Sequence, residues 1–279
     1  MPIHDQGYRR YTGRRVRPGK GWWVVARAGM LERLRERRFL ALLLLAWAPF
    51  VVRALQVYAS TRFGQLSFLA PDANTFREFL DQQSLFLFFI TIYAGSGLIA
   101  SDRRANALQV YLSKPLTRVE YVAGKFVVLA IFLLAASWLP AMALLGLQMI
   151  LAASPGLIRD NPFLVPSITL FCAIEVAASS LAMLALSSLS KSRRFVAVMY
   201  AGTIFFAAAF YQVLQSMTGS TRWAWLSPEE VFDVLGAAIF RSGGNPSVSL
   251  PVAVIAIAGL ATASILILDR RVRPVDVVS

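Results

Sequence analysis

The chain has 279 residues, of which 57% are hydrophobic, with a formal net charge of +13 and a single cysteine, Cys172. Soluble globular domains are only about 45–50% apolar, so this composition excludes a soluble protein and indicates one that crosses a membrane several times. One cysteine excludes a disulfide framework within the chain. The first 20 residues contain no apolar run, so no cleavable signal peptide is expected.

Two basic segments precede the first apolar stretch. Residues 1–21 are polar and arginine-rich, and are predicted to form a cytoplasmic tail. Residues 22–38 are amphipathic, with Trp23, Ala26 and Met30 near one face and arginines around the rest. A helix of this type lies in the membrane interface with its aromatic residues at headgroup level. The alternative is that these arginines form only the positive flank of the first span; we favour the interfacial helix.

Six apolar stretches then follow, and a bilayer crossing takes about 20 helical residues. We therefore expect an all-α membrane protein with a transmembrane domain over residues 39–268 and a short cytoplasmic tail at 269–279. Pro49 interrupts the first expected span, and the third contains Pro140. The second span reaches full length only if the helix before it runs straight on. The expected spans are about 39–59, 85–100, 126–153, 163–189, 195–217 and 250–268.

The basic residues divide unevenly between the two sides that six spans create. Lys and Arg number 22 in the two terminal segments and the loops at 101–125 and 190–194, and six on the other side. An excess of this kind marks the cytoplasmic side, so both termini are predicted to be cytoplasmic. The positive charge then needs no nucleic-acid partner and favours contact with anionic membrane lipid instead.

The two longer loops on the opposite side each carry a helix signal. Thr75 and Glu78 are spaced as a helix cap and its partner in the loop at 60–82. In the loop at 218–249, Ser227, Pro228 and Glu230 have the pattern of an N-cap, a first-turn proline and a capping-box glutamate. The sequence predicts a short helix that ends near residue 240, either a surface helix or a re-entrant one.

The segment at 101–125, SDRRANALQVYLSKPLTRVEYVAGK, is the longest polar interruption on the basic side. Ser101 or Asp102 is placed to cap a short helix, which Pro115 would end. Thr117 and Glu120 form a capping box for a second, long helix. The segment therefore predicts a short helix, a proline break and a well-defined entry into the third span.

This segment resembles the cytoplasmic loop of type 2 ABC exporter permeases, which are membrane subunits that pair with a separate ATPase. The matching residues are Asp102, Arg103, Leu108, Leu112, Ser113, Pro115, Thr117, Arg118, Gly124 and Lys125. Asn106 and Ala107 stand where that family usually has Gly-Thr.

The resemblance implies that an ATPase subunit docks on residues 101–116 and supplies energy from ATP, because this chain has no nucleotide motif of its own. Leu108, Tyr111 and Leu112 would enter a groove of the partner, while Arg103 and Arg104 would meet acidic groups and Asp102 lies beside them. The resemblance also implies a homodimer of the permease with two ATPase copies. The expected location is the plasma membrane, in bacteria the inner membrane.

The sequence offers no catalytic, cofactor or metal site, since it has one histidine, one cysteine and none of the usual catalytic motifs. The ionisable residues placed inside the expected spans are Arg53, which is close enough to a helix end to snorkel, and Glu175. A charge at the bilayer centre costs about 2.5–3.5 kcal/mol or more, so Glu175 is expected to face protein or water. It is a candidate intramembrane polar site, with an interhelical hydrogen bond as the structural alternative.

Small residues surround Glu175 in the fourth span, and they predict that this span is buried in the bundle. They are Ala177, Ala178, Ser179, Ser180, Ala182 and Ser187. The leading hypothesis for function is the permease subunit of an ABC exporter. The alternatives are a stand-alone secondary carrier or channel, which should contain more polar intramembrane residues, and a membrane scaffold without transport activity.

Overall fold

The computed structural model of the chain describes residues 21–62, 73–107, 116–151, 161–242 and 247–272. These residues are almost all helical and contain no strand. Six of the helices within the described ranges are long and apolar enough to cross a membrane, which confirms the predicted all-α architecture. They are Arg37–Arg62, Asn74–Arg104, Arg118–Leu151, Leu164–Leu189, Arg193–Thr218 and Leu250–Arg271.

Breaks divide three of these long helices into shorter ones. The elements in chain order are α1 (Gly21–Leu34), α2 (Arg37–Leu45), α3 (Ala48–Arg62), α4 (Ala73–Ile90), the π-helix η2 (Thr91–Gly95), α5 (Ala100–Arg104), α7 (Arg118–Ala136), α8 (Trp138–Leu151), α10 (Leu164–Leu189), α11 (Arg193–Thr218), the 3₁₀ helix η3 (Thr221–Leu226), α12 (Pro228–Phe240) and α13 (Leu250–Arg271).

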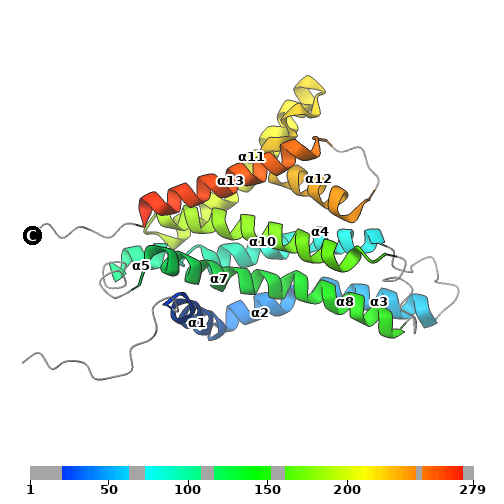
Figure 1. The fold of residues 1–279 in the computed structure, drawn as a ribbon, viewed down its shortest axis with the longest axis horizontal. Helices are drawn as coiled ribbons and strands as arrows, with labels where there is room; N and C mark the ends of the chain where they lie inside the picture. The colour runs from blue at the N-terminus through cyan, green and yellow to red at the C-terminus, as the bar shows by residue number, and fades with distance from the viewer. Residues whose placement is uncertain (1–20, 63–72, 108–115, 152–160, 243–246, 273–279) are drawn as a thin grey trace, which may run out of the picture.

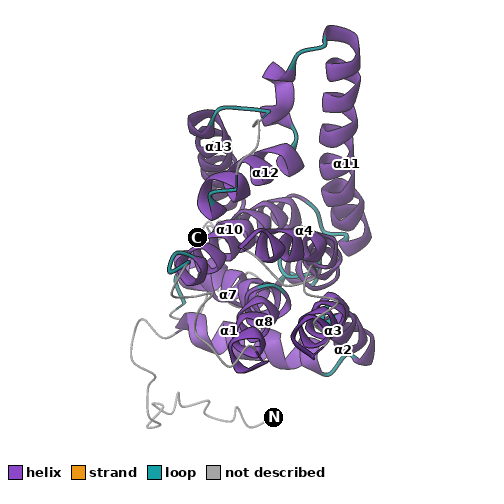
Figure 2. Ribbon diagram, turned by 90° about the vertical axis from the view of Figure 1, so that its right-hand side faces the viewer, coloured by secondary structure: helices purple, strands orange, loops and turns teal. Residues whose placement is uncertain are grey.

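The bundle is arranged around α10, which contacts α7, α8, α11, α12 and α13. The helices run along the long axis of the molecule, with α5 at one end and α12 near the other (Figure 1). We call these the loop end and the α12 end. Helix α11 stands at the edge of the bundle (Figure 2). Ala178, Ser180 and Ser187 of α10 are buried, so the predicted placement of the small-residue span inside the bundle is confirmed.

Two prolines divide the first and third spans, the first of them as predicted. A proline ring inside a helix clashes with the carbonyl four residues earlier. Helix α2 ends at Leu45, four residues before Pro49, and α7 ends at Ala136, four residues before Pro140. The Ala136 carbonyl still accepts a hydrogen bond, because the buried Gln83 amide of α4 donates to it at 2.7 Å. A freed backbone group must find such a partner in an apolar environment.

The second span is longer than expected from sequence. Helix α4 continues into η2 and, after a turn at residues 96–99, into α5, so the span runs from Asn74 to Arg104 instead of beginning near residue 85. Thr75 therefore lies inside α4, which begins at or before Ala73, and the prediction that Thr75 caps this helix is wrong. The apolar stretch near residue 85 is too short to span alone, and the extension supplies the missing length.

Helix α1 packs across α7 through small residues. Ala26, Gly29 and Arg33 are buried, and they lie on one face of α1. A Cβ atom at Gly124 of α7 would lie 2.7 Å from the Trp22 carbonyl oxygen, and one at Gly29 would lie 2.9 Å from Val128. Both glycines therefore allow the two helices to approach more closely than a larger residue would permit.

The short helix predicted in the loop at 218–249 is present as α12. It begins at Pro228 behind the N-cap Ser227 and ends at Phe240, as the proline and serine pattern predicted. The capping-box role of Glu230 is wrong, since its carboxylate accepts a hydrogen bond from the Ser247 hydroxyl at 2.7 Å. Ser227 makes no side-chain cap bond. Glu230 thus ties α12 to the segment that leads into α13.

The close crossing of α1 and α7 yields a first prediction. We expect Gly124→Ala to destabilise the protein by about 1–3 kcal/mol, because the added methyl group overlaps the Trp22 backbone and overpacking costs about that much. Thermal unfolding of the purified protein in detergent measures this effect.

Gly146→Ala is the matched control for Gly124→Ala. Gly146 also lies inside a helix, α8, and no atom comes within 4 Å of a Cβ placed there. Alanine should be neutral or stabilise by up to about 1 kcal/mol, since it has the better helix propensity. Equal unfolding midpoints for the two variants would contradict the proposed tight crossing.

Candidate functional site

A polar junction joins the second span to α10 at the loop end. The chain turns between η2 and α5, and this break leaves backbone N–H groups without helical partners. The Ser187 hydroxyl of α10 accepts from Ile99 N at 3.1 Å and from Ala100 N at 3.0 Å, and it donates to the Ser96 carbonyl at 3.0 Å. Ser187 is completely buried. One side chain therefore satisfies three backbone groups and sets the position at which α5 leaves the bundle.

An ion pair joins α5 to the third span beside this junction. Lys125 Nζ of α7 lies 2.7 Å from Asp102 Oδ2, and the two side chains are only 11% and 16% exposed. The Tyr121 hydroxyl donates to the same carboxylate oxygen at 2.7 Å. The Lys125 ammonium also lies 5.6 Å from the centre of the Tyr121 ring. Asp102, one of the predicted coupling residues, is thus held inside the protein by two residues of α7.

The two adjacent arginines differ in their surroundings. Arg103 donates to the Ser188 carbonyl at the end of α10, so its guanidinium is anchored within the chain. Arg104 is exposed at the loop end and presents its charge outward. Leu108, Tyr111 and Leu112, the apolar residues predicted to contact an ATPase, lie outside the described residues, and their predicted role stays a prediction.

The entry into α7 agrees with the sequence, and the start of α5 does not. Thr117 Oγ1 accepts from Glu120 N at 3.2 Å, and the Glu120 carboxylate accepts from Thr117 N at 3.0 Å. This is the predicted capping box. By contrast, neither Ser101 nor Asp102 caps a new helix: α5 follows Ile99 without a side-chain cap bond. The Ser101 hydroxyl donates to the Gly97 carbonyl instead.

A cavity opens toward the α12 end, between α4, α10, α11 and α12. Its volume is about 500 Å³, within the usual range of about 300–1,000 Å³ for small-molecule sites. Glu175, the predicted intramembrane polar residue, lines it from α10. Glu175 is 7% exposed, and its Oε2 has no hydrogen-bond partner among the residues that the structure describes. The sequence-based expectation that Glu175 avoids lipid agrees with this burial. The alternative was an interhelical hydrogen bond, and Oε2 forms none within the described residues.

Four further carboxyl groups line the same cavity, which sequence reasoning missed. They are Asp81, Glu229, Glu230 and Asp233. Asp81 lies on α4, and the other three lie on α12. Arg77 forms an ion pair with Asp233 and donates to the Ser242 hydroxyl at 2.7 Å. This contact joins α12 and the segment after it to α4.

The described residues contain no group of three or more His, Cys, Asp or Glu side chains close enough to hold a metal ion. Within those residues, the cavity carboxylates are therefore spread around a volume and do not converge on one point. Two polar regions result: a tightly bonded junction at the loop end and an acidic cavity nearer the α12 end. Helix α10 carries residues of both.

The junction yields a second prediction, made on two buried serines of α10. Ser187→Ala leaves the N–H groups of Ile99 and Ala100 unsatisfied, at a cost of about 1–3 kcal/mol each. We expect a lower unfolding midpoint and faster amide hydrogen exchange at those two residues.

Ser180→Ala is the matched control, because Ser180 is also completely buried but its hydroxyl has no hydrogen-bond partner in the described part of the chain. We expect a neutral or slightly stabilising effect there. If Ser187→Ala were tolerated as well as Ser180→Ala, the junction would not depend on the Ser187 hydroxyl.

Comparison with known proteins agrees with this architecture. No curated protein matches the chain significantly. A family model described as "ABC-2 family transporter protein" matches residues 23–271, which covers all six long helices and most of the chain. The predicted resemblance to type 2 ABC permeases is therefore confirmed, and the chain belongs to the ABC-2 family of membrane transporter proteins.

Proposed function

We propose that this permease exports its substrate with energy from a separate ABC ATPase that docks on residues 101–116. The observation that carries the proposal is the polar junction at the loop end. The Ser187 bonds, the Asp102–Lys125 pair and the Arg103 bond join the start of the loop to both α7 and α10. A displacement of the loop by a closing ATPase would thus move three helices together as a rigid body.

The exposed face of the loop end supports the docking step. Arg104 is exposed and forms no ion pair with the residues that the structure describes, so its charge can meet an acidic group on a partner. Trp22, Trp23, Leu31 and Leu34 of α1 are also exposed. An amphipathic helix with exposed aromatic residues beside basic ones suits the membrane interface, which supports an interfacial α1 next to the docking surface and contact with membrane lipid.

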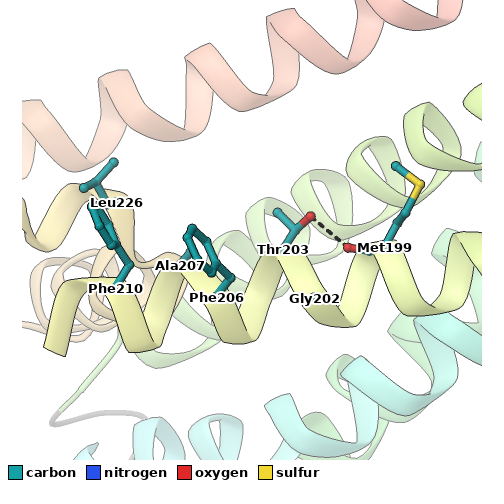
Figure 3. Close-up of a pocket in the computed structure, with 7 residues that line it drawn as sticks. All are labelled: Met199, Gly202, Thr203, Phe206, Ala207, Phe210 and Leu226. Carbon is teal, nitrogen blue, oxygen red and sulfur yellow. Dashed lines mark hydrogen bonds between the residues drawn. The ribbon is translucent and has the colours of Figure 1, made fainter. Parts of the chain in front are cut away.

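We also infer that the permease works as a homodimer, with α11 in the interface. A groove of about 570 Å³ runs along this helix and is lined by apolar and small residues. Figure 3 shows Phe206 and Phe210 on α11, with Leu226 of η3 near Phe210. Gly202 has open space beside it. Small residues let helices approach closely in a membrane. This face therefore suits contact with a second helix better than a face made only of bulky residues would.

The rival reading is a stand-alone secondary carrier. The cavity with its five carboxyl groups lends that reading more support than the sequence did, since carriers place polar residues within their spans. Copurification of an ATPase distinguishes an ABC permease from a secondary carrier, because a carrier needs no ATPase. The family of the chain and the bonded loop end favour the ABC mechanism.

Orientation is the third prediction. In a background with Cys172→Ala, Thr221→Cys should react with an impermeant thiol reagent on intact cells, while Ser192→Cys should react only after permeabilisation. Both positions are exposed in the structure and lie at opposite ends of α11. The reason is the excess of Lys and Arg at the loop end, which marks the cytoplasmic side. Labelling of Ser192→Cys alone on intact cells would invert the proposed orientation.

Docking is the fourth prediction. Leu108→Asp and Arg104→Glu should each reduce copurification of the ATPase, by tenfold or more for Leu108→Asp if it is a buried anchor worth about 2 kcal/mol. Arg222→Glu is the matched control for Arg104→Glu, since it reverses an exposed arginine at the other end of the molecule. The assembly should contain two permeases and two ATPases by mass measurement.

Retained binding of the ATPase by both loop variants, with unchanged ATP hydrolysis coupled to transport, would refute docking on this loop. A thermal unfolding scan of each variant shows whether the bundle is intact. If Leu108→Asp unfolds, the comparison of Arg104→Glu with Arg222→Glu still tests docking.

A further inference from the structure

We propose that the acidic cavity between α4, α10, α11 and α12 is the substrate site and that it takes an organic cation with an apolar body. This inference rests on the proposed transport function and names the class of substrate, which neither the family nor the fold indicates.

The charge of the cavity lining carries the first step. Five carboxyl groups, from Asp81, Glu175, Glu229, Glu230 and Asp233, line the cavity, and its lining includes no Lys, Arg or His. Arg77 pairs with Asp233 from outside the lining. The excess of carboxyl groups over basic groups favours a positively charged ligand and disfavours an anionic one.

Glu175 provides an independent second observation. Its side chain is more than nine-tenths buried, and its Oε2 has no hydrogen-bond partner within the described structure. A buried polar atom without a partner costs about 1–3 kcal/mol. A cationic group that donates a hydrogen bond or simply lies beside this carboxyl group would remove that cost. The remaining carboxyl groups lie on α4 and α12 and are more exposed than Glu175.

The aromatic residues define the other half of the ligand. Phe88 of α4 stacks on Tyr200 of α11 with ring centres 5.9 Å apart, and it meets Phe205 edge to face at 5.5 Å. Phe171 and Phe232 are 6.4 Å apart on α10 and α12. All five rings line the cavity. Aromatic faces attract cations and also bury apolar surface, so they suit an ammonium or phosphonium group attached to hydrocarbon.

Size and spacing argue against a bare metal ion. The cavity volume of about 500 Å³ is that of an organic molecule rather than an ion. A divalent cation would need several oxygen ligands at about 2.0–2.6 Å, and the described carboxyl groups form no such cluster.

The test compares two ions of nearly the same shape and opposite charge. Tetraphenylphosphonium and tetraphenylborate are titrated separately into the purified full-length permease in a neutral detergent, with detergent alone as the blank. We expect the cation to bind at least about tenfold more tightly, the effect of roughly one charge-assisted contact. Equal affinity for both ions, tighter binding of the anion, or no binding of the cation overturns the proposal.

Three variants locate the binding site. Glu175→Gln and Asp81→Asn should each weaken cation binding by about fivefold or more, since each removes one cavity carboxylate. Glu78→Gln is the control: Glu78 lies on α4 near Asp81 but does not line the cavity, and it is paired with Arg53 at 3.1 Å. It should change affinity by less than about twofold.

Equal effects of the three substitutions would place the cation elsewhere and overturn the assignment. If Glu175→Gln fails to fold, Asp81→Asn decides the question, because Asp81 is exposed and forms no ion pair within the described residues. The assay contains no ATPase. A permease that copurifies with the ATPase but does not prefer the cation would thus reject the ligand class alone. A permease that prefers the cation but does not copurify with an ATPase would reject the coupling mechanism alone.

Discussion

The hydroxyl group of Ser187 satisfies the backbone where the second span breaks, and the loop end depends on this contact. Inside an apolar bundle, freed backbone N–H and C=O groups must find partners in the protein. Ser187 accepts two and donates one hydrogen bond at the turn before α5. The Asp102–Lys125 pair then joins the same short helix to α7. The segment that leads to the loop is therefore attached on two sides before it leaves the bundle.

Helix α10 connects this junction to the cavity. Ser187 and Glu175 are 12 positions apart on it, which corresponds to about 18 Å along a helix. The helix is buried along most of its length and contacts α4, η2, α5, α7, α8, α11, α12 and α13. Packed interiors move as rigid bodies rather than deforming continuously. Movement of the loop end would consequently displace the part of the cavity wall that Glu175 forms.

Sequence reasoning succeeded for some local signals, although the caps predicted at Thr75, Glu230 and Ser101 or Asp102 are not formed. Pro49 and Pro140 set the ends of α2 and α7, and Thr117 with Glu120 set the start of α7, because each effect acts within four residues. It failed where the partners are distant. Asp81, Glu175 and Asp233 lie on three helices far apart in the chain, so their convergence has no local pattern. Ser187 looked like one small residue in a packing stripe, and its hydrogen-bonding role depends on a turn 90 residues earlier.

Hydrogen–deuterium exchange of the permease, alone and with the ATPase proposed to dock on its loop, tests the central claim most directly. The account predicts slower amide exchange at residues 100–107 and 116–120 when the ATPase binds, with no slowing in α12 at the other end of the molecule. Binding of the ATPase with unchanged exchange at the loop end, or with slowing confined to α12, would contradict it.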